Sequence, residues 1–92
     1  MTDAQTHKEA GNAVFGEGDY EKALQHYSSA IEINATDPDL FSNRAQVYFV
    51  LQEYEKAVAD ADMAIQADPT FARAYLRKAT ALFDMTHLEN FK

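Results

Sequence analysis

The chain has 92 residues, of which 47% are hydrophobic and 25% charged, and its formal net charge is -7. This length suits one small domain, taken here as residues 1–92, and the acidic balance argues against nucleic acid or an anionic membrane as a partner. The chain has no cysteine, which excludes disulfides and thiolate metal sites. It contains neither a signal-like apolar run at its start nor a spanning stretch, so we expect a cytoplasmic protein that would also fit the nucleus.

The sequence repeats itself at an offset of 34 residues. The segment 19–24, Asp-Tyr-Glu-Lys-Ala-Leu, returns at 53–58 as Glu-Tyr-Glu-Lys-Ala-Val. The same offset matches small residues with small ones and large with large, as in Gly11, Ala45 and Ala79, or Phe15, Phe49 and Phe83. A fixed period of this kind is typical of a solenoid built from one supersecondary unit.

Each repeating unit predicts two helices joined by a short turn. Gly18 and Asp19 mark the first turn, and Asp37 followed by Pro38 is a start signal, with aspartate as N-cap and proline at the first helical position. The predicted helices run from about 6 to 17, 20 to 33, 38 to 51, 54 to 67 and 71 to 85. The repeats therefore span about 4–37, 38–71 and, incompletely, 72–92.

The third unit stops where its second helix is expected to begin. Leu88 stands at the position of the tyrosine that opens the other second helices, or Phe91 takes that part if the connector is about three residues longer, and both registers stay open. In either case the last helix lacks its partner and exposes an apolar face that includes Ala79 and Leu82. We therefore expect a piece of a longer protein, or a helix paired with another chain in a homo-oligomer.

The residues offer little for catalysis, metal or cofactor binding. There is no glycine-rich phosphate loop and no cysteine nucleophile, and His7, His26 and His87 lack ligand spacing. Asp60 and Asp62 are two residues apart on a predicted helix, so they point in different directions and are expected to be solvated. We predict no enzyme activity, no metal and no cofactor.

The repeated residues resemble the tetratricopeptide repeat family. Its signature has a small residue and an aromatic one on the first helix, then Tyr, Ala, an aromatic residue and Ala on the second, and a closing Pro. The first repeat matches it at Gly11, Val14, Tyr20, Ala23, Tyr27 and Ala30, but Ala35 stands where its closing Pro is expected, with Pro38 nearby. The second repeat matches it at Ala45, Tyr48, Tyr54, Ala57, Ala61, Ala64 and Pro69. The resemblance implies an all-α fold, a right-handed superhelix of antiparallel helix pairs with two full repeats and the first helix of a third.

In that family the first helices of the repeats line a concave groove. Their polar positions here, spaced at helical intervals on one face, match the family's carboxylate-clamp pattern with Lys8, Asn12, Asn43, Arg73 and Arg77. The resemblance thus implies that these five residues bind the carboxylates of a peptide's C-terminal end. The side chain that precedes the terminal residue is expected in an apolar pocket formed by Phe15, Gln46, Phe49 and Val50.

The resemblance implies a co-chaperone adaptor that captures the acidic Glu-Glu-Val-Asp tail of the seventy- and ninety-kilodalton heat-shock chaperones. Two other readings stay open. Arg73 or Arg77 would be an ordinary surface cation if it paired with Asp39 or Asp68. The domain would instead be a scaffold for self-association or for a partner helix if it resembles co-chaperones with CS and SGS domains, as the stretch 74–78 suggests.

Overall fold

The structure is a computed structural model that describes the backbone of residues 3–90 and the side chains of residues 3–87. It consists of five α-helices, and the described part of the chain contains no β-strand. In chain order the helices are α1 (Ala4–Gly16), α2 (Tyr20–Ile33), α3 (Pro38–Val50), α4 (Tyr54–Ala67) and α5 (Ala72–Asn90). The first four lie within two residues of their predicted bounds.

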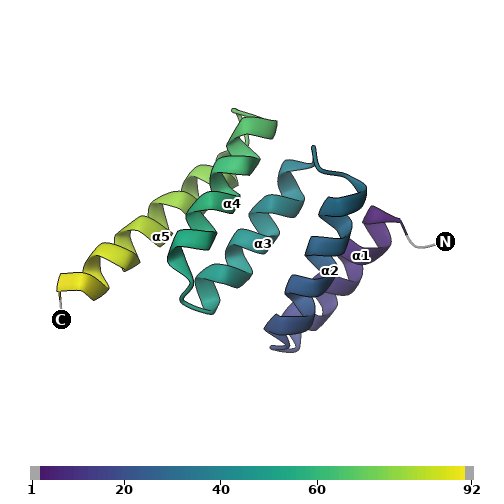
Figure 1. Cartoon of the computed structure of the whole chain (residues 1–92), viewed down its shortest axis with the longest axis horizontal. Coiled ribbons are helices and arrows are strands. Elements are labelled where there is room, and N and C mark those ends of the chain that lie inside the picture. The colour runs from purple at the N-terminus through teal and green to yellow at the C-terminus, as the bar shows by residue number, and fades with distance from the viewer. Residues whose placement is uncertain (1–2, 91–92) are drawn as a thin grey trace.

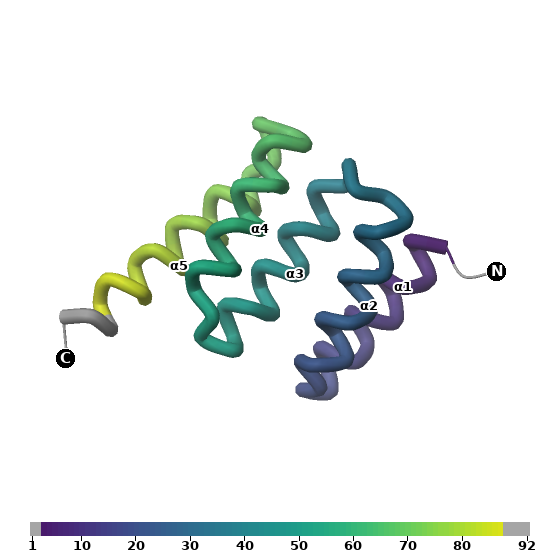
Figure 2. Tube along the Cα trace, in the orientation of Figure 1, coloured from purple at the N-terminus to yellow at the C-terminus, as the bar shows by residue number. Residues whose placement is uncertain are grey.

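The helices stack along the long axis of the molecule in the order of the chain (Figure 1). The helices α1 and α2 pack as one pair and α3 and α4 as the next, while α2 contacts α3 and α5 contacts both α3 and α4. The molecule is elongated, with extents of 48 × 30 × 16 Å, and α1 and α5 lie toward opposite ends of it (Figure 2). The predicted all-α solenoid of helix pairs is confirmed.

Aspartates start the first three helices. The side chain of Asp3 accepts a hydrogen bond from the backbone N–H of Thr6 at 2.8 Å, and Asp37 accepts one from the N–H of Asp39 at 2.9 Å. Each bond satisfies one of the backbone donors that a helix leaves open in its first turn. Pro38 occupies the first turn of α3, where it sacrifices no hydrogen bond, so the start signal predicted at this position is confirmed.

Small residues allow the paired helices to approach closely. Gly11 of α1 is buried against the ring of Tyr27 on α2, and a Cβ atom at position 11 would lie only 2.6 Å from Tyr27 Cε1. The helix α4 and its neighbours use alanine for the same purpose, at Ala45, Ala57 and Ala61 among others. The small residues that recur in the sequence are therefore the contact points of the helix pairs.

One polar network lies in this core. Asp60 of α4 has only 5% of its surface exposed, and the guanidinium of Arg44 on α3 binds both of its carboxylate oxygens. The prediction that Asp60 is solvated is wrong, because the packing of α3 on α4 covers this carboxylate and supplies its partner. Asp62 does lie at the surface, where it pairs with Lys78 of α5 at 2.8 Å.

The helix α5 is longer than predicted. The first two helix pairs turn through a residue with positive φ, Gly18 at 84° and Gln52 at 62°. The equivalent residue of the third repeat is Thr86, and a β-branched side chain is strongly disfavoured in that left-handed conformation. The helix accordingly continues to Asn90, so Leu88 does not open a second helix. The alternative residue, Phe91, lies outside the described residues.

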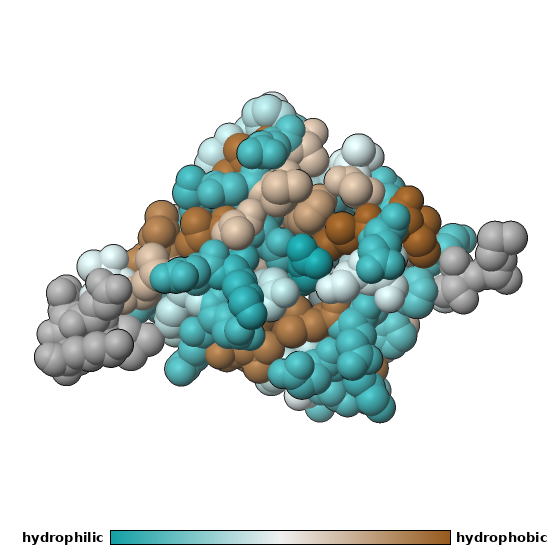
Figure 3. Space-filling view, in the orientation of Figure 1, coloured by the Kyte–Doolittle hydropathy of each residue, from teal (hydrophilic) through white to brown (hydrophobic). Residues whose placement is uncertain are grey.

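The face of α5 that a second helix would cover is open. Leu76 is 57% exposed and Phe83 is 68% exposed, and Ala79 and Leu82 are exposed beside them. Ala79 matches Gly11 and Ala45 in the repeat, both of which are buried by a partner helix. The predicted apolar face is therefore present. Figure 3 shows hydrophobic residues among hydrophilic ones at the end of the molecule formed by α4 and α5.

Candidate functional site

The three cations predicted to bind carboxylate lie on α1 and α5, and a carboxylate of the protein itself joins two of them. Asp39, in the first turn of α3, pairs through Oδ2 with Lys8 of α1 and through Oδ1 with Arg73 of α5. A single carboxylate thus bridges the first helices of all three repeats. The reading in which Arg73 pairs with Asp39 is confirmed, whereas Asp68 binds the N–H and hydroxyl of Thr70 instead.

Arg77 lies one helical turn beyond Arg73 and has no acidic partner within the described part of the chain. Its Nε atom is buried and makes no hydrogen bond there. Burial and, to a lesser extent, the nearby charge of Arg73 lower the pKa of the Arg77 guanidinium. An anion in contact with the Arg77 guanidinium would offset both effects.

The two asparagines bring amide groups to the same helices. The hydroxyl of Tyr27 donates to Oδ1 of Asn12, which leaves both N–H donors of the Asn12 amide for another acceptor. Asn43 of α3 is half-buried, and its side chain makes no hydrogen bond to other described residues. A carboxylate accepts hydrogen bonds only, so it complements amides oriented in this way.

The residues predicted to form the apolar pocket come from α1 and α3. Phe15 packs edge-on against Tyr20 with ring centroids 5.3 Å apart, and Phe49 packs in the same manner against Tyr54 at 5.6 Å. Both phenylalanines are half-buried, as is Gln46, while Val50 is exposed. Their role as a side-chain pocket stays a prediction.

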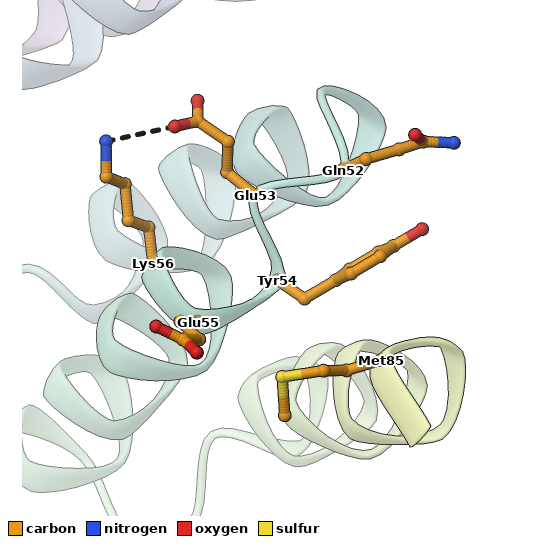
Figure 4. A pocket seen from close by; sticks show the side chains of 6 residues that line it. All are labelled: Gln52, Glu53, Tyr54, Glu55, Lys56 and Met85. Carbon is orange, nitrogen blue, oxygen red and sulfur yellow. Dashed lines mark hydrogen bonds and ion pairs between the residues drawn. The ribbon is translucent and has the colours of Figure 1, made fainter. Parts of the chain in front are cut away.

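A separate pocket of about 320 Å³ lies between the turn from α3 to α4 and the second half of α5. It shares no residue with the predicted site and is lined by Gln52, Glu53, Tyr54, Glu55, Lys56 and Met85. Figure 4 shows Lys56 directed to Glu53, to which it is bound at 2.9 Å, and Tyr54 above Met85. The lining of this pocket carries two carboxylates, Glu53 and Glu55, and one cation, Lys56, so its charge balance does not favour an anion.

Two of the histidines meet although their spacing in sequence gives no sign of it. The Nδ1 atoms of His7 on α1 and His26 on α2 are 3.3 Å apart. Among residues with described side chains, no three metal-ligating groups of the His, Cys, Asp and Glu kind converge, and two histidines are too few ligands for a structural zinc site.

No helix of the described residues is long and apolar enough to cross a membrane.

Stacked helix pairs with a 34-residue period, whose first helices carry cations and amides, define a helical-repeat protein of the interaction type. The chain belongs to the tetratricopeptide repeat family. The family pattern described as "TPR repeat" matches residues 11–52, and the one described as "Tetratricopeptide repeat" matches residues 38–71. Domains of this kind are non-catalytic protein-interaction modules.

Curated relatives of this chain are larger proteins. The chain is 40% identical over 83 residues to Hsp70-Hsp90 organizing protein 2 of Arabidopsis thaliana, a match that covers 90% of the chain and 14% of the relative. It is 39% identical over 80 residues to the Protein SGT1 homolog of Oryza sativa subsp. japonica, covering 87% of the chain and 22% of the relative. The chain therefore spans less than a quarter of the length of either protein.

A solved structure is similar over nearly the whole chain. It is the second TPR of Spaghetti (RPAP3) bound to the HSP90 peptide SRMEEVD. The TM-score is 0.89 at 34% sequence identity, and the match covers 96% of this chain and 82% of that one. The arrangement of the five helices is thus similar to that of a domain bound to a chaperone peptide.

Proposed function

We propose that this domain captures the acidic C-terminal tail of the seventy- and ninety-kilodalton heat-shock chaperones, as part of a co-chaperone. The observation that carries the proposal is that Lys8 and Arg73 bind one carboxylate, while Arg77, one helical turn away, has no acidic partner among the described residues. Cations from helices far apart in sequence are therefore close enough to grip one acidic group. The similar RPAP3 domain, bound to a peptide that ends Glu-Glu-Val-Asp, supports the choice of ligand.

The chemistry of such a tail matches the site. Its last residue carries two carboxylates, one on the main chain and one on the aspartate side chain, and it therefore needs several cations with amide donors between them. Lys8, Arg73 and Arg77 supply the charge, and Asn12 and Asn43 supply the donors. At about 1.5–3 kcal/mol for each charge-assisted bond, less the cost of ordering a short peptide, we expect micromolar binding near −8 kcal/mol.

The valine before the terminal aspartate requires an apolar contact. Phe15 and Phe49 are half-buried on the helices that carry Asn12 and Asn43, and Gln46 and Val50 flank Phe49 on α3. We assign the valine to this set of four side chains. Recognition of this kind needs no chemical step, so we assign the domain no catalytic role. A chaperone partner and a chain without cysteine both fit a protein of the cytoplasm or nucleus.

The direct test is calorimetric titration of the domain with a peptide that ends Glu-Glu-Val-Asp, in free-acid and C-terminally amidated forms. The free acid should bind at least tenfold more tightly, because amidation removes one of its two terminal carboxylates. Its affinity should fall as the salt concentration rises. Equal binding of the two peptides would overturn the carboxylate site.

Variants locate the site on the domain. Arg77→Ala and Asn43→Ala should each weaken binding of the free acid by about tenfold or more, since each removes a group that faces the ligand in this proposal. Lys78→Ala is the matched control, because Lys78 neighbours Arg77 on α5 but pairs with Asp62 of α4. It should bind almost as the unaltered domain does. A loss at Lys78 equal to that at Arg77 would show that general charge, rather than this site, attracts the peptide.

A second function is favoured by the exposed side chains of Leu76 and Phe83 on α5. They suit a scaffold for self-association or for a partner helix, a reading that accords with the similarity to the SGT1 homolog. Light scattering separates the two functions. A dimer indifferent to the tail peptide favours assembly, and a monomer that binds the free-acid peptide favours tail capture.

A further inference from the structure

We propose that Asp39 sets the selectivity of this site by acting as an internal competitor: it holds Lys8 and Arg73 while the site is empty, and it yields them to an incoming carboxylate. The inference rests on the proposed function. Its consequence is that a tail with two terminal carboxylates binds tightly, whereas a tail with one terminal carboxylate gains little binding free energy from displacing Asp39.

The position of Asp39 makes this competition effective. Each of its carboxylate oxygens is used by a different cation, Oδ2 by Lys8 and Oδ1 by Arg73. The side chains of Asp39 and Lys8 are only 22% and 19% exposed, so solvent screens their interaction less than it screens a surface pair. The side chain of Arg73 is 53% exposed, and we expect it to be released first.

The charges near Asp39 indicate what the site accepts. Lys8, Arg73 and Arg77 contribute three positive charges and Asp39 one negative charge, so these four residues sum to 3 − 1 = 2 positive charges. A C-terminal aspartate brings two negative charges and balances them. A C-terminal asparagine has nearly the same shape but brings one negative charge, that of its main-chain carboxylate. It therefore only replaces the carboxylate that Asp39 already supplies.

Other groups that face Asp39 do not change this account. Burial raises the pKa of Asp39, but the hydrogen bonds and charges of Lys8 and Arg73 together outweigh it and lower the pKa below its ordinary value. From α2, burial and the charge of Asp39 raise the pKa of the Tyr27 hydroxyl. At neutral pH Asp39 is therefore ionised and Tyr27 neutral, so the competitor carries its full charge.

The experiment compares the unaltered domain with Asp39→Asn, using free-acid tail peptides that end in Val-Asp and in Val-Asn. Asp39→Asn should bind both peptides more tightly, by about fivefold for the Val-Asp peptide and by more for the Val-Asn peptide, so that discrimination between them shrinks. Asp62→Asn is the control, because it makes the same change in net charge and frees a different cation of α5, Lys78. It should leave both affinities and their ratio unchanged.

The possible results separate this inference from the proposed function. If the unaltered domain prefers the free acid to the amide but Asp39→Asn binds no more tightly, the competitor role of Asp39 is wrong and the carboxylate site stands. If neither protein distinguishes the free acid from the amide, the site itself is wrong. Far-ultraviolet circular dichroism establishes that the variant keeps its helices.

A measurement on the unaltered domain does not depend on how the variant folds. Carboxyl carbon NMR gives the pKa of Asp39 with and without the Val-Asp peptide. Loss of its two cations to the peptide should raise that pKa, and the peptide's own negative charge should raise it further. A pKa that stays the same on saturation with peptide would show that Asp39 keeps Lys8 and Arg73, and would overturn the inference.

Discussion

Arg44 of α3 and Asp60 of α4 meet in a two-point ion pair, with Nε 2.7 Å from Oδ2 and Nη2 2.8 Å from Oδ1. The third guanidinium nitrogen donates to the hydroxyl of Ser28 on α2 at 3.2 Å. The hydrogen bonds to Asp60 outweigh burial and raise the pKa of Arg44, so its charge is secure. This network joins the first helix pair to the second and thereby helps to hold α1 and α3 in the relation that the binding site requires.

Asp60→Ala should lower the free energy of unfolding by about 3–5 kcal/mol, because it leaves the largely buried guanidinium of Arg44 without its partner. Urea denaturation followed by circular dichroism measures the loss. Asp62→Ala, which removes the surface pair with Lys78, is the control and should cost no more than about 1 kcal/mol. Equal losses at the two positions would contradict the structural role of the pair.

Gly11→Ala should destabilise the domain by about 1–3 kcal/mol, even though alanine favours a helix. The added Cβ would lie 2.6 Å from Cε1 and 2.9 Å from Cδ1 of Tyr27, a ring that is only 3% exposed and has little room to move. Because the Tyr27 hydroxyl orients Asn12, tail binding should weaken as well.

Gly16→Ala provides the contrast to that substitution. A Cβ at position 16 meets no atom of the described residues packed around α1 within 4 Å, so the change should be neutral or stabilise the domain by up to about 1 kcal/mol through helix propensity. Thermal unfolding of the two variants side by side measures both effects. A stabilised Gly11→Ala protein would show that α1 and α2 are not in close contact there.

Asp39 should make stability depend on acid pH. Its pKa is lowered in the folded domain from the reference value of 3.8, so its contribution is present well above pH 3.8 and is lost as the pH falls through the folded-state pKa. Asp39→Asn should flatten the curve of unfolding free energy against pH in this acid range, relative to the unaltered domain. Superimposable curves would mean that Asp39 gains nothing from Lys8 and Arg73.

Gln52→Gly should stabilise the domain by about 0.5–1 kcal/mol. Gln52 has a φ of 62° in the turn between α3 and α4, a conformation that costs any residue with a Cβ and is free for glycine. Gly18→Ala, at the equivalent turn with a φ of 84°, should be destabilising by about 1 kcal/mol. Denaturant titration measures the change in the free energy of unfolding for both variants, and the two changes must have opposite signs.

The sequence by itself determined the period of 34 residues, the four helices from α1 to α4 and the small residues between paired helices. These features follow from local chemistry: apolar residues recur at helical spacing, aspartate caps a helix start, and Pro38 fits only the first turn. The three cations and two asparagines also share helix faces that spacing alone predicts.

The tertiary structure decided which side chains meet across helices. Asp39 lies between Lys8 and Arg73, and Asp60 is covered together with Arg44, because helices distant in the chain pack at those points. The length of α5, by contrast, has a local cause that the repeat pattern did not reveal, because Thr86 stands where the other two repeats turn through the positive φ of Gly18 and Gln52. Local spacing specifies the face of a helix, whereas the neighbour of that face depends on how the helices cross and how closely their small residues let them approach.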